Sequence, residues 1–104
     1  MTKVALTIAG SDSSGGAGIQ ADLKTFAMNC VHGASVVTCV TAQNTIGVTQ
    51  VAQMSKSLIT AQIDAVGSDL VVSAVKTGML LNSAIITTIA QQLKQQNWQQ
   101  LVVD

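Results

Sequence analysis

The sequence predicts an α/β fold, in which helices cover both faces of a mainly parallel sheet. Short runs of aliphatic and β-branched residues alternate, over 104 residues, with longer segments whose apolar residues recur at helical spacing. The first three apolar runs end at a glycine or in a polar loop. This order is typical of right-handed β-α-β crossovers, which place helices over both faces of a parallel sheet. The length fits one domain.

Four apolar runs are expected to form buried strands. They are residues 3–9, which stop at Gly10, residues 34–41, residues 71–76, and a run that begins at Leu101. Residues 48–54 alternate loosely between apolar and polar and favour a short extra strand. The last run stops at Asp104 as an uncovered strand with unpaired backbone groups, so we expect the sequence to be the first part of a longer chain.

Three helices are expected between these strands, from Gly18 to about Cys30, over residues 56–66, and from Ser83 to Gln96. Ser55 and Ser83 are the expected N-caps, and Gly33 is the expected left-handed residue after the first helix. The positions expected to face the core are Ile19, Leu23, Phe26, Ala27 and Cys30, then Ile59, Ile63 and Val66, then Ile85, Ile86, Ile89, Ala90 and Leu93.

The composition excludes several classes of protein. Hydrophobic residues make up 48% and charged residues 10%, which excludes a disordered chain. Five lysines balance five aspartates without Arg or Glu, so no basic patch for a nucleic acid or an anionic membrane is expected. Cys30 and Cys39 lack the spacing of a disulfide framework or a metal site. We therefore expect both to be reduced thiols packed in the core of a cytoplasmic protein.

Three loops follow the carboxyl ends of the expected strands, and most chemically interesting residues lie in them. These loops are residues 10–17, 43–47 and 77–80. In sheets of this kind, ligands bind beyond the carboxyl ends of the strands. The sequence thus predicts a ligand site where these loops meet.

The first loop contains four glycines in nine residues, Gly10 to Gly18, but fits neither common phosphate motif. Gly16 begins a G-x-G-x-x-A pattern, yet no acidic residue between Asp22 and Asp64 could hold a dinucleotide ribose. The P-loop pattern fails because Gly16 and Ala17 stand where Lys and Ser or Thr are needed. The remaining interpretation is that the glycines let the backbone approach a ligand closely, and that the helix N-terminus offers free N–H groups.

Three motifs carry a family resemblance. Residues 8–26 (IAGSDSSGGAGIQADLKTF), residues 41–48 (TAQNTIGV) and residues 74–79 (AVKTGM) closely resemble those of hydroxymethylpyrimidine/phosphomethylpyrimidine kinases of thiamine biosynthesis. Residues 102–104 resemble a later family strand, so the resemblance covers essentially the whole chain. One departure is Ser13, where many relatives have Pro.

The resemblance implies a ribokinase-like, three-layer α/β/α fold with a mainly parallel central sheet. Relatives run to about 250–270 residues as one domain. Residues 1–104 would therefore be the N-terminal substrate-binding part of such a kinase domain, its β-α-β-α-β-α-β portion, ending within a strand.

The implied activity is transfer of phosphate from ATP, with Mg²⁺, to 4-amino-5-hydroxymethyl-2-methylpyrimidine and to its monophosphate. The family's catalytic base, anion hole and most of its ATP site belong to the C-terminal half. We therefore assign no catalytic, cofactor-binding or metal residue here, and expect this chain alone to be inactive. Two alternatives stay open, a pyridoxal or pyridoxine kinase on the same fold and a non-catalytic aminopyrimidine-binding remnant. The resemblance also implies a homodimer.

Gln43 is the first candidate for substrate binding, since a carboxamide matches the donor and acceptor of an aminopyrimidine. Asp22 has two interpretations, a pocket residue or a charge that complements the helix dipole in the first turn. Met79 is expected to lie against the ring, and Gly10 and Ala17 to bring backbone to the substrate.

The other residues considered are interpreted as structural. Lys76 could face a phosphate, but a snorkelling surface lysine is the preferred interpretation. Met28 and Met54 are expected in the core, and His32 is expected to be structural or solvent-facing.

Overall fold

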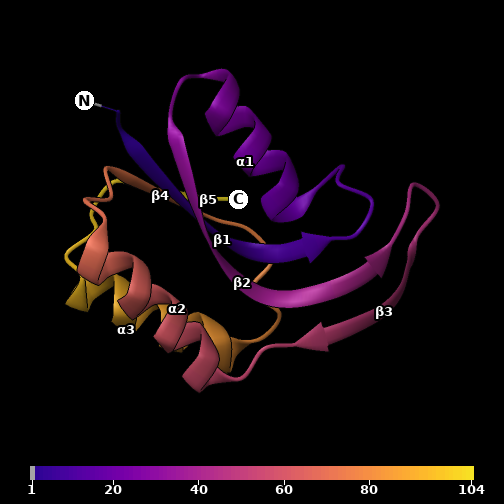
Figure 1. Cartoon of the computed structure of the whole chain (residues 1–104). Helices are drawn as coiled ribbons and strands as arrows, with labels where there is room; N and C mark the ends of the chain where they lie inside the picture. Colours follow the sequence, from indigo (N-terminus) through magenta and orange to yellow (C-terminus); the bar gives the residue numbers. More distant parts are fainter. Residues whose placement is uncertain (1) are drawn as a thin grey trace.

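The computed structural model describes residues 2–104 as a three-layer α/β/α arrangement. The strands are β1 (Val4–Asp12), β2 (His32–Gln43), β3 (Val48–Gln53), β4 (Ala74–Thr77) and β5 (Leu101–Val103), and the helices are α1 (Gly18–Met28), α2 (Lys56–Asp69) and α3 (Ser83–Gln95). One helix, α1, lies over one face of the sheet, and α2 and α3 lie together over the other (Figure 1). The α/β prediction is confirmed.

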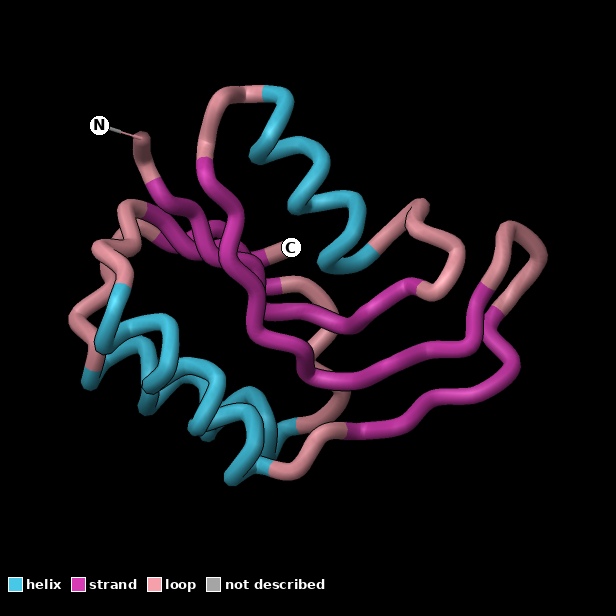
Figure 2. Tube along the Cα trace, viewed as in Figure 1, coloured by secondary structure: helices cyan, strands magenta, loops and turns pink. Residues whose placement is uncertain are grey.

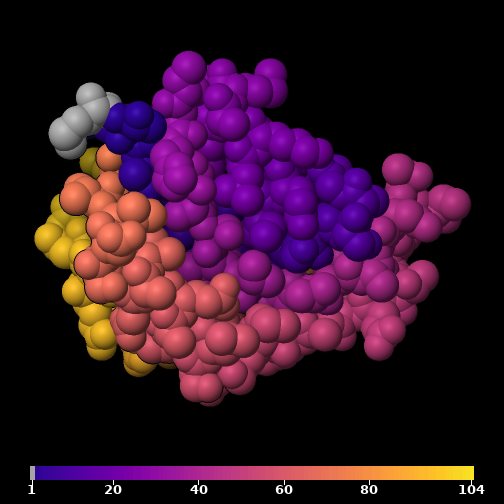
Figure 3. Space-filling model, viewed as in Figure 1, coloured from indigo at the N-terminus to yellow at the C-terminus, as the bar shows by residue number. Residues whose placement is uncertain are grey.

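The sheet has the strand order β3-β2-β1-β4-β5. Neighbouring strands are parallel except β3, which pairs antiparallel with β2 through a hairpin. The expected extra strand is therefore confirmed as β3. The tube trace shows the β2–β3 hairpin extending beyond the helices (Figure 2), and its turn stands out from the surface in Figure 3.

The core lies between the sheet and the α2–α3 pair. Its fully or almost fully buried members are Leu6, Ile8, Val36 and Val75 from the strands, Ile59 and Ile63 from α2, and Ile85, Ile89 and Leu93 from α3. Met54 packs against this cluster, as expected. Ser55 is confirmed as the N-cap of α2, since its Oγ accepts from the N–H of Leu58 at 3.1 Å.

Several expected element boundaries were wrong. The third strand begins at Ala74 instead of Val71, which is exposed, because only residues 74–77 pair with β1. The helix α2 continues to Asp69, past Gly67. A Cβ at Gly67 would overlap the Gln96 side chain, so this glycine lets that amide pack against α2.

The predicted role of Gly33 was also wrong. Gly33 lies within β2, and the left-handed residue after α1 is Cys30, with φ 58°. A Cβ at Gly33 would stand 2.7 Å from Leu23 Cδ2 and 3.1 Å from Phe26 Cδ2, so any other residue there would force these side chains of α1 to shift. Cys30 is exposed, so only Cys39 of the two thiols is in the core.

The buried stripe of α3 is narrower than the sequence predicts. Ile86 and Ala90 are exposed, because α3 buries one row of side chains against the sheet and α2. The N-cap is Asn82, whose Oδ1 accepts from the N–H of Ile85 at 3.0 Å, and not Ser83. Met28, expected in the core, is the last residue of α1 and is exposed. Ala27 is exposed on the same helix.

One glutamine side chain forms hydrogen bonds with the part of β2 that β3 does not pair with. The β2–β3 pairing reaches only as far as Cys39 opposite Gln53. Just beyond it, Gln62 of α2 accepts from the N–H of Val37 at 2.8 Å and donates to its carbonyl at 3.0 Å. The carboxamide thereby replaces a neighbouring strand for one residue.

Gln62→Leu is expected to lower the free energy of unfolding by about 1–3 kcal/mol, because both backbone groups of Val37 lose their partner in a partly buried place. Urea denaturation followed by circular dichroism measures the change. Gln95→Leu, at an exposed site on α3, is the matched control and should change stability little. Equal effects of the two substitutions would contradict this role.

Candidate substrate-binding cleft

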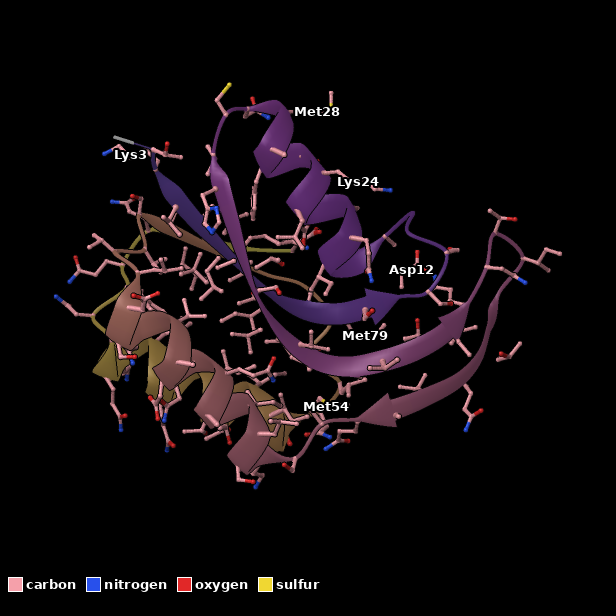
Figure 4. All side chains as sticks on the ribbon, in the orientation of Figure 1. Lys3, Asp12, Lys24, Met28, Met54 and Met79 are labelled. Atoms are coloured by element: carbon pink, nitrogen blue, oxygen red, sulfur yellow. The ribbon has the colours of Figure 1, made fainter. Side chains whose placement is uncertain are left out.

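A cavity of about 490 Å³ opens at the carboxyl ends of β1, β2 and β4. The predicted meeting of the three loops is confirmed, since each contributes residues to its lining. The lining residues are Ala9, Gly10, Ser11, Asp12, Ala17, Gly18, Thr41, Gln43, Lys76, Gly78, Met79 and Asp104. Figure 4 shows the labelled Asp12 and Met79 at the same end of the sheet, and Met28 at the far end of α1.

Four of the five candidate residues line this cavity, namely Gly10, Ala17, Gln43 and Met79. They come from β1, the loop before α1, the end of β2 and the loop after β4. The fifth candidate, Asp22, is absent from the lining and contacts it through Lys76.

Asp12 organises the glycine loop from within. Its carboxylate is almost fully buried and accepts hydrogen bonds from the backbone N–H groups of Ser14 (2.8 Å), Gly16 (3.0 Å) and Ala17 (2.8 Å). The Ser14 hydroxyl adds a bond at 2.7 Å. The N–H groups of Gly16 and Ala17, just before α1, are therefore not free for a ligand, because an internal carboxylate already occupies the position of an anion.

These hydrogen bonds favour the ionised form of Asp12. The Ser14 hydroxyl has the largest effect and lowers the pKa of Asp12 below its ordinary value. Burial opposes this shift, and the backbone N–H groups of Ser14, Ala17 and Gly16 add to it. The ionised carboxylate is thus the form that holds the loop.

Gln43 is fastened to the glycine loop by its backbone. Ser13 Oγ donates to the Gln43 carbonyl at 2.6 Å and accepts from the Gln43 N–H at 2.8 Å. The side-chain Oε1 of Gln43 lies 3.1 Å from Thr41 Oγ1, whose nearer acceptor is the Ser11 carbonyl at 2.8 Å. The carboxamide is therefore presented to the cavity from a fixed backbone.

Asp22 and Lys76 form a partly buried ion pair at the wall of the cavity, which Lys76 lines. Lys76 Nζ lies 2.8 Å from Asp22 Oδ2, which also accepts from Thr7 Oγ1 at 2.6 Å. Asp22 is beyond the first turn of α1, so its interpretation as a helix-dipole charge was wrong.

The preferred interpretation of Lys76 was also wrong. Its side chain is only 20% exposed, and Asp104 Oδ2 lies 3.9 Å from Nζ as a second carboxylate. Two carboxylates against one ammonium group do not favour a phosphate at this position.

Asp12 and Ser13 were missed as site-organising residues by the sequence reasoning. Asp12 could have been found, because an Asp in a turn before a helix commonly accepts from nearby N–H groups. The pairing of Ser13 with Gln43 spans 30 positions and leaves no local signal. His32 is exposed, which agrees with the second of its two expected interpretations, a solvent-facing residue.

Comparison with known families decides the relationship. The profile of the family described as phosphomethylpyrimidine kinase matches residues 12–104. The chain belongs to this family. The hydroxymethylpyrimidine/phosphomethylpyrimidine kinase of Synechococcus elongatus is 62% identical over 87 residues, which are 84% of this chain and 33% of that protein. The kinase of the same name from Rhizobium meliloti is 60% identical over 94 residues, 90% of this chain and 35% of that protein.

Solved structures give the same relationship and confirm the ribokinase-like architecture. Phosphomethylpyrimidine kinase from Clostridium difficile superposes with a TM-score of 0.96 at 53% identity, over 99% of this chain and 45% of that one. Bacillus subtilis pyridoxal kinase, solved as an ADP complex, superposes with a TM-score of 0.91 at 42% identity, over 100% of this chain and 40% of that one. The chain spans about a third of the length of the curated relatives it matches.

Proposed function

We propose that these residues are the N-terminal substrate-binding part of a ribokinase-like kinase domain that acts in thiamine diphosphate biosynthesis. The kinase transfers the γ-phosphoryl group of ATP to the hydroxymethyl group of 4-amino-5-hydroxymethyl-2-methylpyrimidine, and phosphorylates the monophosphate again. Family membership supports this proposal. The observation that carries it is the carboxamide of Gln43 in a cavity at the carboxyl ends of parallel strands.

The carboxamide of Gln43 matches one edge of the aminopyrimidine. Its Nε2 donates to the ring nitrogen while its Oε1 accepts from the exocyclic amino group. The Thr41 hydroxyl is compatible with this arrangement, because it carries one hydrogen and has the Ser11 carbonyl as its nearer acceptor. Gly10 and Met79 supply a small and an apolar surface beside the ring.

The phosphoryl donor in this proposal is ATP with Mg²⁺. Pyridoxal kinase from Staphylococcus aureus, similar in fold at 35% identity, has been solved with AMP-PCP and with ADP. Among the residues described, 2–104, no three His, Cys, Asp or Glu side chains gather where they could hold a metal ion. As part of the proposal we assign no residue of this chain to Mg²⁺, to the nucleotide or to catalysis, and propose that the 104 residues alone are inactive.

The second candidate is a pyridoxal or pyridoxine kinase, because solved pyridoxal kinases superpose on the whole chain. A third is a non-catalytic domain that binds the aminopyrimidine without turning over ATP. No helix within residues 2–104 is long and apolar enough to cross a membrane. A cytoplasmic location and a homodimer are part of the proposal.

Equilibrium titration of the chain with the pyrimidine and with pyridoxal separates the first two candidates. An assay of ATP consumption by the natural protein that carries these residues separates the third candidate, which consumes none in the presence of the pyrimidine. The proposal predicts tighter binding of the pyrimidine and no ATP consumption by the 104 residues. Tighter binding of pyridoxal would favour the second candidate. Binding of neither ring would contradict a substrate-binding role.

A further inference from the structure

Met79 is held in place by two buried residues of β2. Met79 follows β4 outside any helix or strand and is 52% exposed. The Thr38 hydroxyl donates to the Met79 carbonyl at 2.8 Å, and Cys39 Sγ lies 3.8 Å from Met79 Sδ. Thr38 and Cys39 are fully buried, and neither lines the cavity. They therefore support this wall of the cavity from inside the protein.

An irregularity in β2 brings both side chains to this place. Ala9 of β1 is opposite Val37, but Ser11 is opposite Val40, so Thr38 and Cys39 together face the single residue Gly10. Such a bulge adds one residue to a strand and redirects its side chains, and bulges are frequent beside active sites. Here the extra residue allows two successive residues of β2 to contact Met79, one through its carbonyl and one through its sulfur.

Gly10 leaves the space that Cys39 uses. A Cβ at position 10 would stand 2.8 Å from Cys39 Sγ and 3.8 Å from Met79 Sδ. The thiol and the thioether thus lie directly against the backbone of Gly10, which lines the cavity together with Met79. Since a methionine side chain is flexible by itself, a fixed position for Met79 depends on these contacts.

We infer that Thr38 and Cys39 are positioning residues that fix Met79 and thereby set the ring selectivity of the cavity. The inference rests on the proposed function. Pyridoxal carries one more ring substituent than the pyrimidine and needs a wider space. A fixed Met79 favours the narrower pyrimidine, whereas a released Met79 loses contact with the pyrimidine and admits the wider ring.

The position of Met79 is tested first, without any ligand. The chain is labelled with [¹³C-methyl]methionine, and the Met79 signal is assigned by Met79→Leu. Thr38→Val removes the hydroxyl at nearly constant volume, and Cys39→Ala removes the sulfur contact. Both substitutions are expected to shift the Met79 methyl signal, and Thr38→Ser, which retains a hydroxyl, is expected to restore it. Matched controls are Thr87→Val on α3 and Cys30→Ala, both at exposed positions.

Ring selectivity is tested by calorimetric titration with the pyrimidine and with pyridoxal. Thr38→Val and Cys39→Ala are each expected to lower the ratio of the affinity for the pyrimidine to the affinity for pyridoxal by about fivefold. This change is equivalent to the loss of one contact. The controls and Thr38→Ser should keep the wild-type ratio. An unmoved Met79 signal overturns the positioning role, and a moved signal with an unchanged ratio overturns the role in selectivity. If the wild-type chain binds neither ring, the proposed function fails, and the methyl signal still decides whether Thr38 and Cys39 position Met79.

Discussion

Replacing Gln43 by alanine is expected to weaken binding of the aminopyrimidine by roughly 5- to 150-fold, since a two-point contact of a carboxamide with a base edge contributes about 1–3 kcal/mol. The fold should persist, because Ser13 bonds the backbone of Gln43 and not its side chain. Calorimetric titration of the chain measures the change. In a complete kinase of this family, the same substitution is expected to raise the KM for the pyrimidine.

The control for this experiment is Gln50→Ala. Gln50 is an exposed glutamine on β3, opposite Ala42 in the same hairpin, and it does not line the cavity. The substitution Gln50→Ala should leave the affinity for the pyrimidine unchanged. Equal affinities of the wild type and Gln43→Ala would remove Gln43 from the binding site.

Asp12→Asn is expected to lower stability and to change how stability depends on pH. In the folded chain the pKa of Asp12 is below its ordinary value, mainly because of the Ser14 hydroxyl. A carboxyl group of this kind stabilises the fold fully above its unfolded pKa, which is about 3.9. This contribution is lost as the pH falls through the lower folded pKa. The carboxamide of the variant cannot carry the charge, so that part of the pH dependence should disappear.

Urea denaturation at a series of pH values, from neutral pH down to about pH 3, which is below the ordinary carboxyl pKa, measures this effect. Asp64→Asn, at an exposed position on α2, is the matched control and should retain the wild-type pH dependence. If Asp12→Asn loses stability with acid as steeply as the wild type, the hydrogen bonds of the glycine loop do not depend on the charge of Asp12.

The fold class and the place of the cleft could be predicted because they follow from periodicity and strand direction. Buried positions such as Ile59 and Ile63 recur at helical spacing, and the carboxyl ends of parallel strands meet at one edge. Local details were harder to predict where two neighbouring residues suit the same structural position. Asn82 and Ser83 are both good N-caps, and only the course of the backbone selects Asn82.

Contacts between distant positions could not be predicted from the sequence. Lys76 and Asp22 are 54 positions apart, and their ion pair depends on the β1–β4 register and on where α1 crosses the sheet. Gly33 has a packing role that depends on Leu23 and Phe26 across a turn. The bulge at Thr38 and Cys39 has no signature in composition, because a run of apolar and β-branched residues continues through it.

The proposed function requires that the cavity beside Gln43 binds the ring of the aminopyrimidine. The most direct measurement follows the side-chain amide signals of Gln43 in ¹H–¹⁵N spectra as the pyrimidine is added, with Gln50 as the internal reference. Binding of the ring beside Gln43 predicts a saturable shift of the Gln43 side-chain signals, with shifts of the Gly10 and Met79 backbone signals at the same midpoint. Unchanged Gln43 signals at concentrations that saturate binding would contradict it.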